Sequence, residues 1–265
     1  MASIQQPDPT DEAFWRDYLT RGRSKERRAR NVLKFIPQDP RCRLCAAPFR
    51  GPGGAIMRLV GKPPSGQNPR LCLSCFTFLT THRGGAEIEC TMLFADIRGS
   101  TNMAEEMPPT EFRQLIDRFH TVASSVVFDH EGTVDKFVGD ELVALFLPLL
   151  SGDRHAASGV EAARDLLRAT GHADPGGPWV PIGASVHTAR TWFGAVGQGA
   201  HVELTAIGDP VNVTARLASR AAAGEILVTT AAAAAAGLDP TLERRQLELK
   251  GKSLTTEVVS LTVSG

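Results

Sequence analysis

The chain has 265 residues, with 29 basic and 29 acidic side chains and 42% hydrophobic residues. These are ordinary values for a folded globular protein, and they exclude collagen-like, low-complexity and wholly disordered chains. The longest apolar run, Leu142 to Leu150, has nine residues, far fewer than the roughly 20 that cross a bilayer. Residues 1–10 are polar and lack the apolar stretch of a secretory signal. We therefore expect a cytoplasmic protein without a membrane span.

The balanced charge hides an asymmetry between two parts of the chain. Residues 1–85 hold 15 Lys and Arg against 6 Asp and Glu, whereas residues 86–265 hold 14 against 23. Such a split indicates two units with different partners or two units that attract each other, although chance and a solvated basic helix would also produce it. We predict a basic helical segment over residues 1–40, a Cys-rich unit over 41–85 that ends at a glycine doublet, and a larger domain over 86–265.

A helix is expected over residues 11–35, before Pro37. Its apolar face consists of Phe14, Trp15, Tyr18 and Leu19. The following stretch from 21 to 30 contains six basic residues. Because this basic run is short and has few interleaved aromatic residues, we do not expect nucleic-acid binding.

Two CxxC pairs, Cys42–Cys45 and Cys72–Cys75, are separated by 26 residues. Four thiolates favour tetrahedral zinc, and a bound ion would help to fold a Gly/Pro-rich segment that is too small for a core of its own. A zinc-ribbon-like unit is the preferred interpretation, with an iron or iron–sulfur centre and metal-free redox thiols as alternatives. The fifth cysteine, Cys90, is expected to be buried on a strand.

Strands and helices alternate from residue 86 onwards, which predicts an α+β fold, a layered α/β sandwich. The expected strands are 87–96, 133–138, 142–147, 180–187, 192–196, 226–229, 246–249 and 256–263. The expected helices are 109–130 with Thr110 as N-cap, 155–170, 210–222 and 230–236. The strands 133–138 and 142–147 form a hairpin around a Gly-Asp-Glu turn.

Two acidic residues lie at the edges of these strands. Asp96 ends an apolar strand, and Asp140 lies in the hairpin turn. If the strands are neighbours, the two carboxylates converge on a site for hard cations such as Mg²⁺. The small residues of the loop after Asp96, including Gly99 and Thr101, have free N–H groups that suit phosphate oxygens. Taken singly, Asp140 is also typical of a turn residue and Asp96 of a helix cap.

Three longer motifs contain these residues. The stretches 93–101 (LFADIRGST), 135–141 (DKFVGDE) and 205–216 (TAIGDPVNVTAR) occur in this order. Together they resemble the catalytic domain of class III adenylyl and guanylyl cyclases, over residues 87–263. The resemblance implies the ferredoxin-like core of that family.

The resemblance also implies a role for each matching residue. Two Mg²⁺ or Mn²⁺ ions would be bound by Asp96, Asp140 and the Ile97 carbonyl, and Asn212 and Arg216 would orient the ribose and stabilise the reacting phosphate. Lys136 and Thr205 would read the base, and Lys250, or else Lys252, would hold the triphosphate. Family members are head-to-tail dimers in which one chain supplies the metal-binding residues and the other supplies the remaining groups. A homodimer of this chain would therefore have two complete sites.

The expected reaction converts ATP to 3′,5′-cyclic AMP and pyrophosphate. A lysine ammonium only donates hydrogen bonds, so Lys136 can serve adenine N1 but cannot accept from guanine N1–H. The Thr205 hydroxyl can donate or accept, and a threonine at this place resembles the class IIIb subgroup. The alternatives are a catalytically silent nucleotide-binding module and a cyclase that prefers guanine or a pyrimidine.

Two departures from the family pattern fall outside these roles. Ala189 replaces a usual glycine in the segment 183–194, and Pro210 is uncommon at its position; both put the local loop geometry in question. His187 is expected to be a packed strand residue rather than a catalyst.

Overall fold

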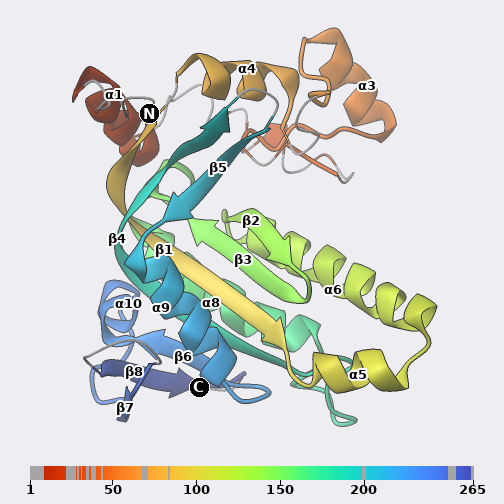
Figure 1. Cartoon of the computed structure of the whole chain (residues 1–265), viewed down its shortest axis with the longest axis vertical. Coiled ribbons are helices and arrows are strands. Elements are labelled where there is room, and N and C mark those ends of the chain that lie inside the picture. Colours follow the sequence, from red (N-terminus) through yellow and green to blue (C-terminus); the bar gives the residue numbers. More distant parts are fainter. Residues whose placement is uncertain are drawn as a thin grey trace, which may run out of the picture. The chain divides into compact units, whose positions relative to one another are not determined.

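The computed structural model describes residues 9–21, 28, 30, 32–33, 36, 40–42, 44–66, 71–82, 84–198, 201–249 and 255–263. The chain divides into two compact units (Figure 1). The first comprises residues 1–88 and 192–207, and the second comprises residues 89–191 and 208–265. Two strands, β1 (Gly84–Ile97) and β4 (Ile182–Gln198), contribute residues to both units.

The first unit contains α1 (Pro9–Arg21), α3 (Gly51–Leu59), α4 (Leu73–Thr81) and β5 (His201–Ile207), which pairs antiparallel with β4. Trp15 and Leu19 on α1 are fully buried and Tyr18 nearly so, which confirms the predicted apolar face. Beyond α1, positions 28, 30, 32 and 33 are helical. The rest of the predicted helix, with most of its basic run, lies outside the described residues.

The second unit is built on a mixed sheet, which confirms the predicted α+β fold. Its strand order is β2 (Thr133–Val138), β3 (Glu141–Phe146), β1, β4, β6 (Ile226–Thr229), β8 (Thr256–Leu261) and β7 (Arg244–Leu247). The helices are α5 (Ser100–Glu106), α6 (Pro109–Asp129), α7 (Pro148–Ser151), α8 (His155–Ala169), α9 (Asp209–Arg220) and α10 (Thr230–Ala235), and a 3₁₀ turn covers Gly152–Arg154. The register of β4 on β6 is parallel, whereas β2–β3, β1–β3, β6–β8 and β7–β8 are antiparallel.

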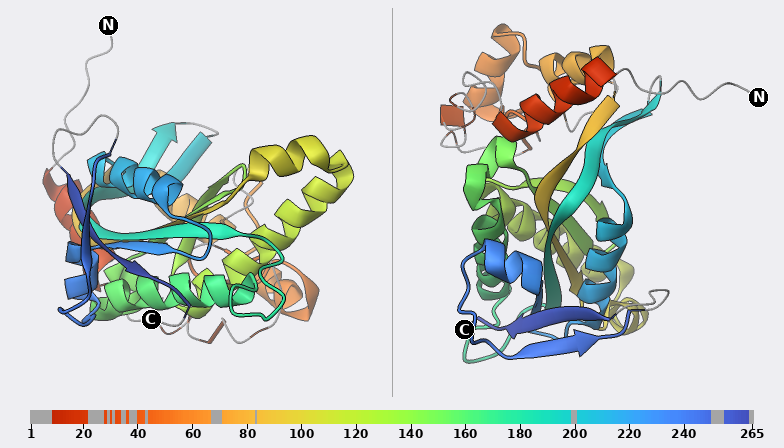
Figure 2. Two further views of the ribbon diagram at one scale, coloured as in Figure 1. Left: turned by 90° about the horizontal axis from the view of Figure 1, so that it is seen from below. Right: turned by 90° about the vertical axis from the view of Figure 1, so that its left-hand side faces the viewer.

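Each face of this sheet carries its own core. Helices α6, α8 and α10 pack on one face against β1, β3, β4 and alternate residues of β6 and β8. Helix α9 packs on the other face, where Val213 and Leu217 meet Leu227 and Val258. Figure 2 shows α8 and α9 on opposite sides of the strands. The period-two alternation along β6 and β8 produces this division, because successive side chains point to opposite faces.

Three sequence predictions were wrong in detail. The expected strands 180–187 and 192–196 are one continuous strand, β4, so Ala189 lies within a strand and not in a loop. The connecting residues Thr188 and Thr191 are buried, and β-branched threonine favours an extended chain. Strand β5 was missed, although apolar residues alternate at 202, 204 and 206. Helix α6 begins at Pro109 with Pro108 as N-cap, so Thr110 lies inside its first turn and does not cap it.

The glycine doublet at 84–85 lies at the start of β1 rather than in a separate linker. A Cβ on Gly85 would lie 2.7 Å from Gly194 Cα, so the backbones of β1 and β4 meet there without an intervening side chain. Only glycine permits the backbones of two strands to approach so closely. The residue boundaries predicted at 40 and 85 remain predictions.

Candidate functional site

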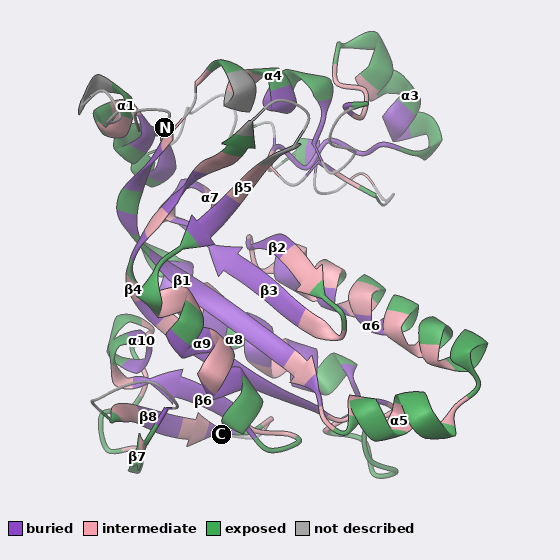
Figure 3. Cartoon of the chain, viewed as in Figure 1, coloured by how far each residue is buried: buried purple, intermediate pink, exposed green. Residues whose placement is uncertain are grey.

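Asp96 and Asp140 are brought together by two neighbouring strands, as predicted from the sequence. Strand β1 pairs antiparallel with β3, and Asp96 lies opposite Glu141. The β2–β3 turn passes through Gly139, whose φ of +62° suits glycine, and therefore places Asp140 directly before Glu141. The carboxyl groups of Asp96 and Asp140 are close enough to influence each other electrostatically. Figure 3 shows β3 and the second half of β1 mostly buried, with partly exposed residues at this end.

The carboxylates at this end of the sheet repel one another. Burial raises the pKa of Asp96 to about 6, with a further increase from the hydrogen bond to Asp140, while the charge of Arg98 acts in the opposite direction. Burial also raises the pKa of Glu141 to about 7, and the charges of Asp96 and Asp140 add to that increase. A cation at this position would relieve the repulsion and favour the ionised forms.

One oxygen at this end lacks a protein partner. Within the described part of the chain, Asp140 Oδ2 is buried and accepts no hydrogen bond. A buried, unpaired carboxylate oxygen is costly, and carboxylate oxygens are the ligands that Mg²⁺ and Mn²⁺ prefer. The residues present therefore fit the divalent cations predicted at Asp96, Ile97 and Asp140. The part assigned to the Ile97 carbonyl stays a prediction.

Arg98 is a component of this site that the sequence reasoning missed. Its guanidinium forms an ion pair with Asp96 Oδ2 and donates to Ser219 O at 3.1 Å, at the C-terminal end of α9. Its backbone N–H donates to Pro181 O at 2.8 Å. Only 22% of the side chain is exposed. A basic residue two positions after a strand-end aspartate was the available signal.

The loop after Asp96 leads into helix α5. Gly99 is the N-cap of α5 and has the left-handed φ of +74°. Thr101 is exposed in the first turn. Contact of these two residues with phosphate stays a prediction.

Lys136 lies on β2 beside a bulge. The β2–β3 register shifts between Val134 and Lys136, which leaves Asp135 as the extra residue. Bulges of this kind redirect a side chain. Lys136 Nζ lies 3.5 Å from Asp135 Oδ2, and the Asp135 side chain is only 4% exposed. Asp135 is a second residue that sequence reasoning missed, because its contact depends on the bulge.

His120 of α6 supports the turn that holds Asp140. Its Nε2 lies 3.0 Å from Gly139 O, and its ring stacks on Phe137 with centroids 3.8 Å apart. These two contacts fix the β2–β3 turn to α6, next to the predicted metal ligand.

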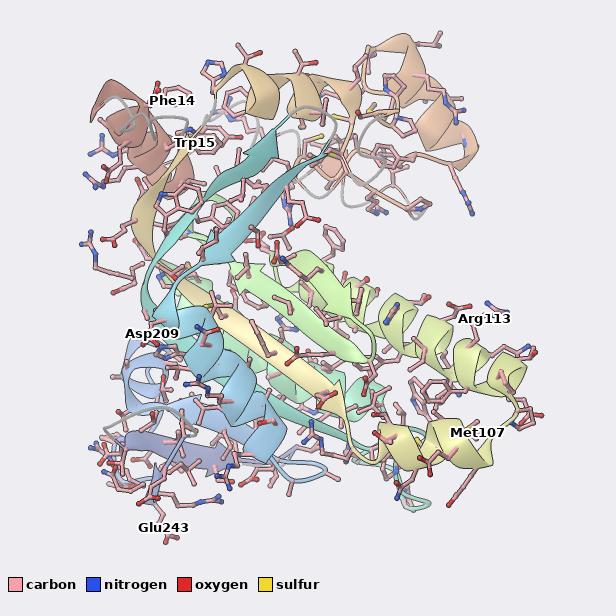
Figure 4. All side chains as sticks on the ribbon, in the orientation of Figure 1. Phe14, Trp15, Met107, Arg113, Asp209 and Glu243 are labelled. Atoms are coloured by element: carbon pink, nitrogen blue, oxygen red, sulfur yellow. The ribbon has the colours of Figure 1, made fainter. Side chains whose placement is uncertain are left out.

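Asn212 and Arg216 lie on α9, which begins beside the labelled Asp209 in Figure 4. Four residues apart, they share one helix face, with Asn212 exposed and Arg216 half-buried. Val213 and Leu217 lie on the neighbouring face of the helix, which is buried against the sheet. Pro210 lies in the first turn, where its missing N–H is harmless, so the unusual proline does not disturb the helix.

The other predicted residues lie elsewhere. Thr205 is 7% exposed on β5, opposite Gly194, and belongs to the first unit. Lys250 and Lys252 lie outside the described residues. His187 lies on β4 with Nδ1 3.0 Å from Thr229 Oγ1, as expected for a packed strand residue.

The four paired cysteines form one buried cluster in the first unit. The sulfur atoms of Cys42, Cys45, Cys72 and Cys75 lie within 4.8 Å of one another. The Cys72 N–H donates to Cys42 Sγ at 3.3 Å, and Cys75 N–H donates to Cys72 Sγ at 3.5 Å. Hydrogen bonding with Cys42 lowers the pKa of Cys45 to about 7. Four converging sulfurs match a tetrahedral metal site.

A lysine lies beside the cysteine cluster. Lys62 Nζ lies 3.9 Å from Cys45 Sγ, where its positive charge offsets the negative charge of thiolates.

The fifth cysteine, Cys90, is buried on β1, as predicted. Burial, and to a smaller extent the charge of Glu89, raises the pKa of the Cys90 thiol to about 12. Cys90 is therefore a structural residue and not a nucleophile.

Comparison with known proteins defines the family. The sequence model described as "Adenylate and Guanylate cyclase catalytic domain" matches residues 85–261. The chain therefore belongs to the adenylate and guanylate cyclase catalytic-domain family. Among the described residues, no helix is long and apolar enough to cross a membrane.

Curated relatives and solved structures agree with this membership. The chain is 32% identical over 134 residues to an adenylate cyclase of Anabaena cylindrica and 31% identical over 135 residues to adenylate cyclase 1 of Rhizobium meliloti. These matches cover 48% and 49% of this chain but only 26% and 20% of those relatives. The adenylyl cyclase CyaB from P. aeruginosa is 25% identical with a TM-score of 0.58, over 67% of this chain and 95% of the other. The guanylyl cyclase Cya2 has the same fold, at 24% identity and a TM-score of 0.62, over 67% and 93% of the two chains.

Proposed function

We propose that this chain is an adenylate cyclase that converts ATP to 3′,5′-cyclic AMP and pyrophosphate. The observation that supports this most strongly is the convergence of Asp96 and Asp140 in a member of the cyclase family. Asp140 directly precedes Glu141, which lies opposite Asp96, and its buried Oδ2 has no partner among the described residues. The named relatives include adenylate cyclases. Lys136 favours adenine because its ammonium donates to N1 of that base.

The proposed reaction assigns a separate role to each site residue. Asp96 and Asp140 would hold the divalent ions, which when bound would lower the pKa of the ribose 3′-OH and shield the phosphates. Asn212 orients the ribose, and the Arg216 guanidinium meets the negative charge that develops on the α-phosphate as pyrophosphate departs. Removal of such a donor typically costs about 2.7–4 kcal/mol, or about 10²–10³ in rate.

The proposed enzyme acts as a homodimer with two composite sites. Each site takes its metal-binding carboxylates from one chain and its base, ribose and phosphate contacts from the other. The five free cysteines fit a reducing, cytoplasmic location, where thiols are kept reduced.

The direct test incubates the purified chain with ATP and Mg²⁺ or Mn²⁺ and measures cyclic AMP. Asp96→Asn should abolish turnover and Arg216→Gln should lower it about 10²–10³-fold, while Asp117→Asn, at an exposed carboxylate on α6, should leave it unchanged. Mixing the two impaired variants should restore part of the activity, because one site of the mixed dimer is intact. No recovery in proven mixed dimers would contradict the composite site.

A guanylate cyclase is the second candidate. The Thr205 hydroxyl can donate or accept a hydrogen bond and therefore permits either purine. Product analysis with ATP, GTP, CTP and UTP separates the two. A kcat/KM for GTP above that for ATP would overturn the adenine assignment.

We also propose zinc as the ion of the cysteine cluster, on the strength of its four buried, mutually close sulfurs. Iron would be held by the same ligands. Elemental analysis of protein purified without added metal should give about one zinc per chain, and iron with visible absorption would contradict it.

A further inference from the structure

The first compact unit contains both the cysteine cluster and the β4–β5 hairpin that carries Thr205. These parts are more than 100 residues apart in the chain. A series of direct contacts within this unit joins them, through α4, α1 and the first residues of β1.

The first link runs along α4. Cys72 is the N-cap of this helix, and its sulfur accepts the N–H of Cys75. An ion held by these two sulfurs therefore fixes the first turn of α4. The far end of the same helix carries Phe78 and the C-cap residue His82, whose rings lie 4.6 Å apart.

The second link joins α4 to α1. The Phe78 ring lies 5.0 Å from the ring of Tyr18 and 6.2 Å from that of Trp15, and the His82 ring lies 5.0 Å from that of Phe14. Ring centroids at 4.5–7 Å are in favourable contact. Phe14 and Trp15 are labelled on α1 in Figure 4. The last turn of α4 thus positions α1.

The third link joins α1 to the strands. A Cβ on Gly84 would lie 3.6 Å from both Cδ1 and Nε1 of the fully buried Trp15. The next residue, Gly85, lies directly against the backbone of Gly194, which is paired with Thr205 in the β4–β5 register. The backbones of Gly84, Gly85 and Gly194 are in direct contact here, with the Trp192 side chain also against Gly85. Because glycine has no side chain that could adjust, we expect a movement of Gly84 to reach Thr205.

We infer that the cysteine cluster is a regulatory metal site, and that its occupancy controls the strand carrying Thr205 and thereby the affinity for the nucleotide base. The inference rests on the proposed function for the role of Thr205. The ligand is a soft, thiolate-seeking divalent ion of the zinc class. Coupling between two sites of one protein typically changes affinity by about 5-fold or more, and here it is carried by packed side chains.

The first experiment measures amide hydrogen exchange of the full chain, zinc-loaded and after chelation. Loss of zinc should increase exchange in α4, as any structural zinc would require, and also in residues 192–198 and 201–207. Exchange that rises in α4 but stays unchanged in both strands would overturn the coupling and leave a purely structural zinc.

The second experiment interrupts the series of contacts between α4, α1 and β1 without changing any of the four cysteines. Trp15→Leu keeps an apolar side chain but cannot reach Gly84 as the indole does. The zinc-loaded variant should keep its zinc content, show the raised exchange in 201–207, and have a KM for ATP about 5-fold or more above that of the native chain. Phe78→Leu, one link earlier, should act in the same direction, and Leu59→Ala, an apolar residue 89% exposed on α3, is the matched control.

The regulatory role of the cysteine cluster and the proposed cyclase function can be contradicted independently. If the amide exchange rates of residues 201–207 in both Trp15→Leu and Phe78→Leu equal those of the native chain, the regulatory role is overturned even if the chain is an active cyclase. Zinc-dependent exchange in a chain that makes no cyclic nucleotide would support the coupling and overturn the proposed function.

Discussion

The Arg98 guanidinium places a positive charge next to the carboxylates at the end of β1. It pairs with Asp96 and opposes the rise in the pKa of both Asp96 and Glu141. Its second hydrogen bond, to Ser219 O, connects the loop after Asp96 to α9. Arg98 therefore stabilises this part of the second unit, and we expect its contribution to be smaller when the proposed metal ion is bound.

We expect Arg98→Gln to lower the free energy of unfolding of the metal-free chain by about 1–3 kcal/mol, because hydrogen bonds to charged groups are lost. Saturating Mn²⁺ should recover part of that loss, because the ion takes over the neutralisation of Asp96 and Asp140. Urea unfolding with and without Mn²⁺ measures both. A loss that is unaffected by Mn²⁺ would contradict this account.

His155 makes stability depend on pH. It is buried, its Nδ1 shares a hydrogen bond of 2.9 Å with Thr91 Oγ1, and burial lowers its pKa, although the charges of Glu89 and Asp153 act in the opposite direction. A histidine whose pKa is lower in the folded than in the unfolded state stabilises the fold fully above the unfolded value of about 6.5. That contribution is lost as the pH falls through 6.5 towards the folded pKa.

Replacing His155 by Asn should therefore flatten the acid side of the stability curve, since the amide retains a polar atom near the Nδ1 position but does not titrate. The native chain should lose up to about 1.4 kcal/mol per pH unit more than the variant below pH 6.5. Urea unfolding between pH 5 and 8 checks this, and parallel curves would rule out His155 as the cause.

At the scale of elements, α8 packs on the sheet through small residues. Ala156, Gly159, Ala162 and Ala163 are all buried. A Cβ on Gly159 would lie 2.7 Å from Thr91 Cγ2 and 3.4 Å from Phe146 Cδ2. This glycine thus sets how closely α8 approaches β1 and β3.

The Gly159→Ala substitution has two effects on stability that oppose each other. Alanine gains about 1 kcal/mol of helix propensity, but an added methyl group in a tight core typically costs about 1–3 kcal/mol. We expect a net destabilisation of up to about 2 kcal/mol in thermal or urea unfolding. Gly176→Ala, where a Cβ has open space, should be close to neutral, and a stabilised Gly159→Ala would show that α8 can move away from the sheet.

The elements also show what the sequence could predict. The β2–β3 hairpin was predicted correctly because its Gly-Asp turn and alternating strands are local signals, and α9 because its apolar spacing is helical. The convergence of Asp96 and Asp140 was predicted from this hairpin and from the apolar strand that ends at Asp96, on the condition that the strands are neighbours, and β1 does pair with β3. The contact of Arg98 with α9 and the link from Trp15 to Gly84 were missed, because both join residues that are distant in the sequence. Strand β5 was missed despite a local signal, since its alternating apolar residues directly follow β4 in a hairpin.

At the scale of the whole molecule, the two units should respond differently to metal removal. The first unit contains Trp15 and Trp192, and the second contains Trp179. The cysteine cluster lies in the first unit, and metal binding contributes directly to the folding of such a site.

In a Trp179→Phe variant, tryptophan fluorescence reports on the first unit alone. A strong chelator should lower the melting temperature seen by fluorescence, while far-UV circular dichroism, dominated by the helices of the second unit, should keep its main transition. A single transition shifted equally in both signals would mean that the units unfold together.

The composition of the first unit has a consequence for protein engineering. Because this unit is assembled from two stretches of chain, 1–88 and 192–207, a single crossover cannot transplant it. A chimaera that grafts residues 1–88 onto a foreign enzyme would leave Gly85 without the glycine it meets at 194. Transfer of the first unit into another protein therefore requires residues 1–88 and 192–207 to be replaced at the same time.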